Sequence, residues 1–493
     1  MRAEIARGAA WMVLFRLVDR AIGVISTTIL ARLLAPADFG LVAMAMSVIA
    51  IIDLATAFSF EIALIQKAEP TRDQFDTAWT LNILIALLGA VVTAALAYPT
   101  ASFYGDERLV PVMLVIGAGW LVSGFENTGT VNFRREMDFA AEFRWMASKR
   151  MIGFVVTLVA AVLFRSYWAL VIGSAIGRIS GVVISYSVHP FRPRLSLASS
   201  RELFSFSGWM LASNIAGVIF GRLPQIYVGR VFGAQTLGPY AVGAEIAQLA
   251  HTELVAPVNR AMFPGYARLV GDPAEFRRVC IGATAAILLV VLPVSAAVAI
   301  LAEPMVRVLL GDQWGQVVPV IQILAFAGAV WALNSNNMSA YLALGKPYLP
   351  TLVMFSRVVA FVAVVAAFAP GRGVVWVAYA ELAGASVSLL VSLPILFSSL
   401  HLSMRDYFAN LWRPLIASAL TAIAVRAGIG EIANAATFLG ALLQLVVGLS
   451  IGAVVYPVLL WLLWTASGRP QAVETLIWQR VVGFLFGLRK GIA

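Results

Sequence analysis

Long apolar runs separated by short polar connections make up almost the whole chain. Runs of about 20 apolar residues recur throughout, and a helix of that length crosses a hydrocarbon layer of about 30 Å. The connections are too short to hold a soluble domain. The pattern predicts an all-α integral membrane protein with about 14 transmembrane helices. The expected spans are residues 9–32, 39–65, 77–99, 109–130, 144–164, 167–188, 205–231, 238–262, 279–302, 317–344, 348–369, 374–399, 412–428 and 436–464.

The composition supports a membrane protein. Hydrophobic residues make up 61% of the chain, charged residues only 12%, and the mean hydropathy is +0.89. Soluble proteins contain roughly 25% charged residues because their surface faces water. The single cysteine, Cys280, excludes a disulfide framework and a thiolate metal cluster. The first apolar run contains Arg16, Asp19 and Arg20, unlike a cleaved signal peptide, so we expect a retained first helix.

The formal net charge of +10 is unevenly distributed. Lys and Arg gather near the N-terminus, in alternate connections and in the C-terminal tail, with dense examples at 134–150 and 192–201. This positive-inside bias predicts that both termini are cytoplasmic. Basic connections also suit anionic lipid headgroups. The charge therefore reflects membrane topology, and we expect no nucleic acid partner.

A polar, glycine-punctuated helix ending occurs twice. Residues 32–40 return in degraded form as residues 230–238, an offset of 198 positions that also pairs Gly23 with Gly221. Two similar lobes of six helices each would enter the membrane in the same orientation, which makes the repeat parallel. Two lobes around one interface are typical of a transporter with alternating access. We expect an N-terminal lobe over 1–200, a C-terminal lobe over 201–400, an extra helix pair over 401–464 and a cytoplasmic tail over 465–493, either interfacial or disordered.

Charged side chains inside the spans indicate where function resides. Arg16, Asp19 and Arg20 share one face of the first helix. A charge at mid-membrane costs about 2.5–3.5 kcal/mol on insertion scales, so these groups need water, a partner or a protein-lined cavity. One interpretation is an internal Arg–Asp pair. The other is a cavity-lining stripe, which the repeat favours because Asn214 and Gln225 hold equivalent positions in the seventh helix.

The second helix shows the same relation. Asp53 and Glu61 share a face, and the offset of 198 maps them onto His251 and Asn259 of the eighth helix. Equivalent polar positions predict a shared central cavity, with ion-paired packing as the alternative for each residue. The candidate substrate-path residues are Arg16, Asp19, Arg20, Asp53, Glu61, Asn214, Arg222, Gln225, Glu245, His251, Asn259 and Arg357.

These side chains differ in the chemistry they offer. Embedded arginines stay charged and bind phosphate oxygens bidentately, so they are candidates to hold an anionic headgroup. Embedded acids could instead bind H⁺ or Na⁺ as a coupling ion. The sequence has no metal-ligand constellation, nucleophile elbow or P-loop, so we expect no catalytic residues, no bound cofactor and no enzyme activity.

Two further patterns concern helix packing. Gly173, Gly177 and Gly181 in the sixth helix predict close approach of a neighbouring helix. The polar residues 334–337 in the tenth helix have two interpretations. They are either an unwound or sugar-facing patch, or a cluster of hydrogen bonds between helices.

Four segments carry a family pattern, namely residues 31–40, 133–139, 263–269 and 309–347. In order and spacing they resemble the polysaccharide transporters of the multidrug/oligosaccharidyl-lipid/polysaccharide (MOP) flippase superfamily, of the Wzx and WzxC-like type. The resemblance covers residues from about 10 to about 350 and implies a MATE-like arrangement of helices. One departure is the segment Arg165-Ser166-Tyr167-Trp168, because relatives usually have a glycine before the tryptophan.

The resemblance implies a flippase of the bacterial inner membrane. Such proteins move an undecaprenyl-pyrophosphate-linked oligosaccharide from the cytoplasmic to the periplasmic leaflet for surface polysaccharide export. The implied partners are this lipid-linked oligosaccharide, membrane lipids and the polymerase or export machinery. An ion-coupled small-molecule or drug antiporter of the same superfamily is one alternative, although the embedded arginines favour an anionic substrate. A membrane-bound glycan polymerase or transferase is another, although it would need longer periplasmic loops.

Overall fold

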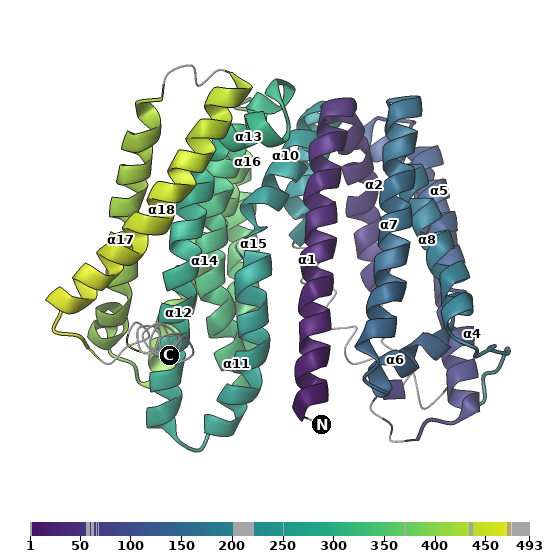
Figure 1. Ribbon diagram of the computed structural model, residues 1–493, viewed down its shortest axis with the longest axis horizontal. Helices are drawn as coiled ribbons and strands as arrows, with labels where there is room; N and C mark the ends of the chain where they lie inside the picture. Colours follow the sequence, from purple (N-terminus) through teal and green to yellow (C-terminus); the bar gives the residue numbers. More distant parts are fainter. Residues whose placement is uncertain are drawn as a thin grey trace, which may run out of the picture. The chain divides into compact units, whose positions relative to one another are not determined.

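Helices form all the regular structure in the described part of the chain, which confirms the predicted all-α class. The computed structural model describes residues 2–55, 60, 64–65, 67, 69–200, 221–249, 251–368, 371–432, 437–470 and 475. Internal contacts divide the chain into two compact units, Met1–Ala241 and Val242–Ala493 (Figure 1). The lobe boundaries at residues 200, 400 and 464 remain predictions, and most of the tail lies outside the described residues.

The first unit is built mainly from long helices. Helix α7 packs against α8 and α1, and α5 packs against α4 and α8. A further helical segment covers residues 221–232. The elements are α1 (Arg2–Leu33), α2 (Pro36–Ala55), α4 (Arg72–Tyr104), α5 (Leu109–Ser123), η1 (Thr128–Thr130), α6 (Val131–Arg135), α7 (Phe139–Phe164), α8 (Trp168–Val188) and the start of α10 (Ala234–Ala247).

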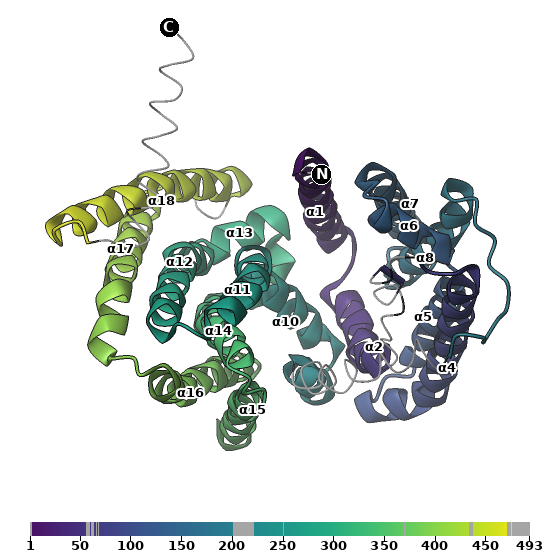
Figure 2. The ribbon, with the colours of Figure 1, turned by 90° about the horizontal axis from the view of Figure 1, so that it is seen from below.

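The second unit is centred on α12 and α14, which pack against each other and against most other helices of the unit (Figure 2). A core of aromatic and aliphatic side chains, including Tyr266, Phe276 and Tyr341, fills the space between them. The elements after α10 are η2 (His251–Val255), α11 (Ala256–Leu269), α12 (Pro273–Ile300), α13 (Ala302–Leu309), η3 (Asp312–Val317), α14 (Val318–Ala343), α15 (Tyr348–Phe368), α16 (Val375–Leu400), α17 (Met404–Gly430) and α18 (Phe438–Ala466).

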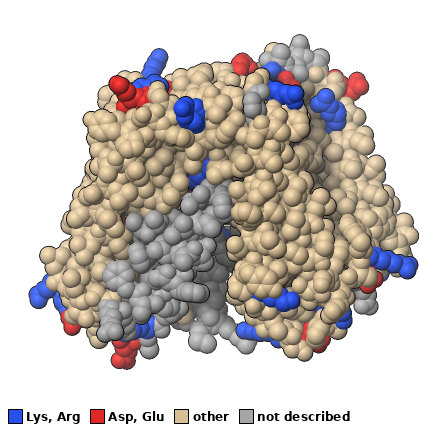
Figure 3. Space-filling model, turned by 180° about the vertical axis from the view of Figure 1, so that it is seen from behind, with Lys and Arg blue, Asp and Glu red and all other residues tan. Residues whose placement is uncertain are grey.

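The described helices account for most, though not all, of the 14 predicted membrane spans. Ten segments are long and apolar enough to cross a membrane, and a bent pair would make an eleventh. Helix α1 has sufficient length but carries the three central charges, and the described part of the seventh span is residues 221–232. On the face shown in Figure 3, charged side chains lie mostly near the two ends of the helices. The nearly uncharged belt between them suits lipid contact.

Two predicted spans are interrupted in the structure. The fourth ends as α5 at Ser123 and continues, after a bend of 65°, through residues 128–135. The amide of Asn127 fixes this bend, since its Nδ2 donates to the Phe191 carbonyl and its Oδ1 accepts from Gly129 N–H. The eighth span is broken into α10, a π-helical turn at His251–Val255 and α11. Proline at position 257 cannot donate the next helical hydrogen bond, which favours the interruption there.

The connection after α8 is held against the first unit by side chains of α4. Backbone N–H groups of Arg194 and Ser196 donate to Asp76 Oδ1 and Thr80 Oγ1, each at 2.9 Å. Both acceptors are buried and lie one turn apart on α4. The proline-broken segment 190–200 therefore satisfies its backbone through side chains instead of forming a helix.

The repeated glycines make a reciprocal contact within the first unit. A Cβ at Gly40 would lie 1.8 Å from the Ala234 carbonyl oxygen, and one at Gly238 would lie 1.9 Å from the Pro36 carbonyl oxygen. The offset of 198 exchanges these two contacts, as a two-fold relation requires. Helices α2 and α10 therefore begin backbone against backbone, which only glycine permits at these two positions.

Candidate functional site

An ion pair connects the charged face of α1 to α7. Arg150 Nε lies 2.9 Å from Asp19 Oδ1, and both side chains are about half exposed. Arg16 is exposed and Arg20 is partly buried. The structure thus gives Asp19 a partner from another helix, in addition to the two interpretations that the sequence left open for the stripe. Arg150 belongs to the basic segment 134–150 of the sequence.

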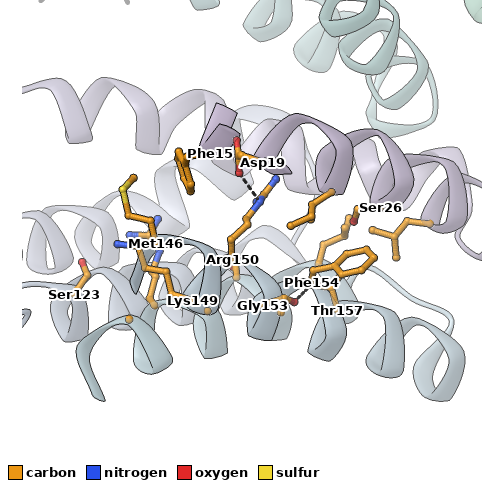
Figure 4. A pocket seen from close by; sticks show the side chains of 18 of the residues that line it. Phe15, Asp19, Ser26, Ser123, Met146, Lys149, Arg150, Gly153, Phe154 and Thr157 are labelled. Carbon is orange, nitrogen blue, oxygen red and sulfur yellow. Dashed lines mark hydrogen bonds and ion pairs between the residues drawn. The ribbon is translucent and has the colours of Figure 1, made fainter. Parts of the chain in front are cut away.

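This ion pair lies in a cavity of about 610 Å³ among α1, α7, α8 and the end of α5, which we call the basic cavity (Figure 4). A second ion pair crosses it, because Lys149 Nζ lies 3.1 Å from Glu126 Oε1. Arg178 of α8 also lines the cavity. Three cations and two carboxylates therefore face one space inside a unit made of membrane-spanning helices.

The shape of the basic cavity follows from small residues on α7 and α8. Gly173 and Gly177 of α8 face Thr157 and Gly153 of α7 so closely that a Cβ at Gly173 would overlap Thr157. This confirms the close packing predicted from the glycine pattern. A cation–π interaction also holds Lys149, since its Nζ lies 4.2 Å from the centre of the Trp145 ring.

Asp53 lines a smaller cavity of about 350 Å³, next to the basic cavity. The two cavities share Ser123 and Glu126. Asp19, Glu126 and Asp53 thus line one polar region of the first unit. The sequence did not reveal this region because the cationic partners of Asp19 and Glu126 lie on α7.

In the second unit, Arg357 of α15 forms a separate charged cluster. Its Nη2 lies 3.7 Å from Glu381 Oε2 on α16, and its guanidinium carbon lies 4.3 Å from the centre of the Trp331 ring. His251 lies in the π-helical turn of the same unit.

The asparagine cluster of α14 links helices by hydrogen bonds. Asn334 and Asn337 donate to Ser388 and Ser392 of α16, and Asn336 donates to Thr284 of α12. All three asparagines are buried in a continuous helix. Of the two interpretations, the structure supports the helix–helix cluster, and the segment is not unwound. Predicted Asn259 joins it by donating to Ser335 at 2.7 Å.

Of the remaining predicted residues, Arg222 and Gln225 are in contact within the described part of the chain. Arg222 donates to Gln225 within one helical segment at 2.9 Å, and Glu245 is exposed on α10. Glu61 and Asn214 lie outside the described residues. Within the described ranges, no group of three His, Cys, Asp or Glu side chains is arranged to hold a metal ion.

Comparison with known proteins identifies the family. A family model described as "Polysaccharide biosynthesis protein" matches residues 29–319, which is more than half of the chain. The chain belongs to this polysaccharide biosynthesis protein family. The match confirms the resemblance that the four sequence segments carry.

Curated relatives of this polysaccharide biosynthesis protein are similar over most of their length. It is 24% identical over 476 residues to the succinoglycan biosynthesis transport protein ExoT of Rhizobium meliloti (strain 1021), covering 93% of each chain. It is 21% identical to the lipopolysaccharide biosynthesis protein WzxC of Escherichia coli (strain K12), covering 86% of this chain and 87% of the relative. The teichuronic acid biosynthesis protein TuaB of Bacillus subtilis (strain 168) is 23% identical, covering 74% and 76%.

Solved structures with a similar fold are flippases and transporters. The lipid II flippase MurJ in an inward closed conformation superposes with a TM-score of 0.72 at 12% identity, covering 93% of this chain and all of MurJ. A multidrug resistance MATE family transporter of the MOP superfamily, inward-facing, gives 0.62 at 13% identity, covering 78% and 94%. This polysaccharide biosynthesis protein therefore has the predicted MOP-like fold, and it is a multi-span membrane protein.

Proposed function

We propose that this protein is a flippase for a lipid-linked oligosaccharide in surface polysaccharide export, with undecaprenyl pyrophosphate as the lipid carrier. The observation that carries the proposal is the basic cavity, since three cations face it inside a membrane-spanning unit. Membership of a polysaccharide biosynthesis family and the MurJ-like fold support the same function.

The three parts of such a substrate differ in polarity and therefore need different surroundings. A saccharide is too polar for lipid and needs a polar cavity. A pyrophosphate is anionic and needs cationic groups in a low-dielectric setting, where Lys and Arg interact with it strongly. A polyprenyl chain is as apolar as the membrane interior, so it can remain in lipid while the headgroup crosses.

The proposed transport follows the membrane topology. The positive-inside bias of the sequence supports cytoplasmic termini and insertion in the inner membrane. The substrate would enter from the cytoplasmic leaflet and leave to the periplasmic leaflet, by alternating access between two repeat-related lobes. A polymerase or export complex would then take up the product. The protein acts as a transporter in this scheme, with no covalent chemistry of its own.

The energy for transport would come from a gradient of H⁺ or Na⁺. The acids Asp19, Asp53 and Glu126 line neighbouring cavities of the first unit and are the groups we propose for cation binding. Proteoliposomes with an imposed pH or Na⁺ gradient separate the two ions. Transport that responds to neither gradient would exclude ion coupling at these acids.

Gene deletion tests the proposed function. The deleted strain should accumulate cytoplasm-facing lipid-linked oligosaccharide and lose surface glycan, and the wild-type gene should restore both. Unchanged oligosaccharide levels with normal surface glycan would refute the proposal. Accumulation of unpolymerised units on the periplasmic side would instead indicate a polymerase. Increased sensitivity to cationic drugs without a glycan defect would indicate a drug antiporter.

A further inference from the structure

Two consecutive residues of α7 hold carboxylates from two different parts of the first unit. Lys149 pairs with Glu126, which follows α5, and Arg150 pairs with Asp19 of α1. Both pairs line the basic cavity, and Figure 4 shows Arg150 reaching from α7 toward Asp19. Lys149 and Arg150, the two cations that α7 contributes to the cavity, are thus each paired with a carboxylate of the protein itself.

Neither pair is sealed away from the cavity. Side-chain exposure is 31% for Lys149 and 29% for Glu126, and 48% for Arg150 and 44% for Asp19. Partly exposed pairs of this kind are weak, because the groups remain solvated and can change partners. A ligand that enters the cavity can therefore compete with the carboxylates for the same cations.

The charge of the cavity favours an anionic ligand. Arg178 adds a third cation to the wall, so positive groups exceed carboxylates by one. A phosphate oxygen cluster offers more acceptors than one carboxylate and matches the planar guanidinium bidentately. An incoming phosphate-type anion is thus a stronger partner for Arg150 than Asp19 is.

We infer that the basic cavity binds a phosphate-type anion by partner exchange, in which Lys149 and Arg150 pass from Glu126 and Asp19 to the ligand. The inference rests on the proposed function, since the headgroup of the transported lipid would be the anion. The inference goes beyond that function in two respects. It assigns the anion site to α7 and α8 of the first unit, and it makes Glu126 and Asp19 internal competitors of the ligand for Lys149 and Arg150.

The exchange would link ligand binding to a movement of helices. The two pairs connect α7 to α1 and to the end of α5. When the ligand takes over both cations, these connections are released, and α1 is held to α7 mainly by apolar contacts such as Trp11 with Phe143. A ligand that binds one arrangement better than the other shifts the population of the two.

Binding of inorganic pyrophosphate to the purified full-length protein in nanodiscs of neutral lipid tests the exchange. Arg150→Gln and Lys149→Gln should each weaken binding about tenfold, the effect of losing one charge-assisted hydrogen bond. Asp19→Asn and Glu126→Gln should tighten it, because the competing carboxylate is gone. Arg144→Gln, an exposed position of the same helix, is the matched control and should leave affinity unchanged.

The opposite signs separate the exchange from a structural role. If Asp19→Asn weakens pyrophosphate binding as Arg150→Gln does, or if all variants bind equally, the inference is wrong. Nanodiscs that contain phosphatidylglycerol identify the source of the anion. Undiminished pyrophosphate binding there supports the transported headgroup, and competition by the phospholipid assigns the same site to a membrane lipid.

Hydrogen exchange gives an independent measure. Pyrophosphate should increase amide exchange in α1 around Asp19, whereas ordinary ligand binding protects the helices it touches. Protection of α1 would contradict the released contact. Failure here remains distinct from failure of the proposed function. Normal export by the Lys149→Gln/Arg150→Gln double variant would refute the partner exchange. It would not refute the flippase function, which the deletion experiment tests.

Discussion

His189 is the residue whose titration should be visible in the stability of the first unit. It follows α8, and its Nδ1 accepts a hydrogen bond from the Phe191 N–H at 3.2 Å. Burial lowers the pKa of His189, opposed by Glu136 and assisted by Arg192. The neutral ring therefore fits the folded state, and protonation removes the acceptor that holds residue 191.

Lower pH should weaken this connection. Because the folded pKa lies below the unfolded value of about 6.5, the stabilisation is complete above that pH and is lost as pH falls through the folded pKa. The thermal midpoint of the purified protein should decrease between pH 7.5 and 5. His189→Asn keeps an acceptor near the Nδ1 position without titrating, so its decrease should be smaller. Equal pH dependence of both proteins would contradict the assignment.

Arg16 and Arg20 are predicted to act on transport without holding the fold together. Arg16 is exposed and Arg20 partly buried on α1, beside the Asp19–Arg150 pair. Alanine at either position should lower glycan export about tenfold, by loss of one charge-assisted contact to the substrate. The amount of protein in the membrane should not change. Arg426→Ala, an exposed arginine of α17, is the control, and full export by both α1 variants would make the stripe structural.

At the scale of single elements, the end of α7 carries a strained residue. Arg165 has φ 46° and ψ 42°, in the left-handed region, while its N–H donates to the Ala161 carbonyl at 3.0 Å. Glycine is the residue that adopts this conformation without steric strain.

A protein with glycine at position 165 should therefore be more stable than one with alanine there. Both variants remove the same exposed side chain, but only glycine relieves the strain, so Arg165→Gly should exceed Arg165→Ala in stability by about 1 kcal/mol. Thermal or denaturant unfolding of the two purified variants measures the difference. Alanine equal to or above glycine would show that the backbone is relaxed here.

Helix positions were predictable to the extent that their signals are local. Helix α4 is longer than its predicted span because Thr71 and Gln74 form a capping box and Gly105 ends the helix in the left-handed region. The interruption near His251 was missed because an apolar run says little about a single π-helical turn. Its signal was the proline at position 257.

The site was predictable in kind and only partly in detail. Charges within apolar runs are visible in a sequence, which is how Asp19 and Asp53 became candidates, and both residues line cavities in the structure. The partner of Asp19 could not be found, since Arg150 meets it only when α1 and α7 pack together. The offset of 198 aligned Asp53 with His251. The structure places Asp53 in the first unit, where it lines the smaller cavity, and His251 in the second unit.

At the scale of the whole molecule, the repeat leaves a contact that the proposed alternating access would break and re-form. Gly40 and Gly238 bring the starts of α2 and α10 together, each against the carbonyl of the other's first turn. A Cβ at either position would push the same two helix ends apart. In a transporter that opens alternately to each side, this contact belongs to one of the two arrangements.

Replacing either glycine with alanine should therefore lower the population of the conformation in which α2 and α10 are in contact. Gly40→Ala and Gly238→Ala should each lower export and increase maleimide labelling of a cysteine placed at Ala37, in a protein whose only cysteine, Cys280, is replaced by serine. Because both substitutions separate the same helix ends, the double variant should show much less than the sum of the two effects. Gly282→Ala, a helical glycine with no neighbour within 4 Å of its Cβ position, is the control. Additive effects, or labelling equal to that of the control, would mean that the two helix ends do not move as one contact.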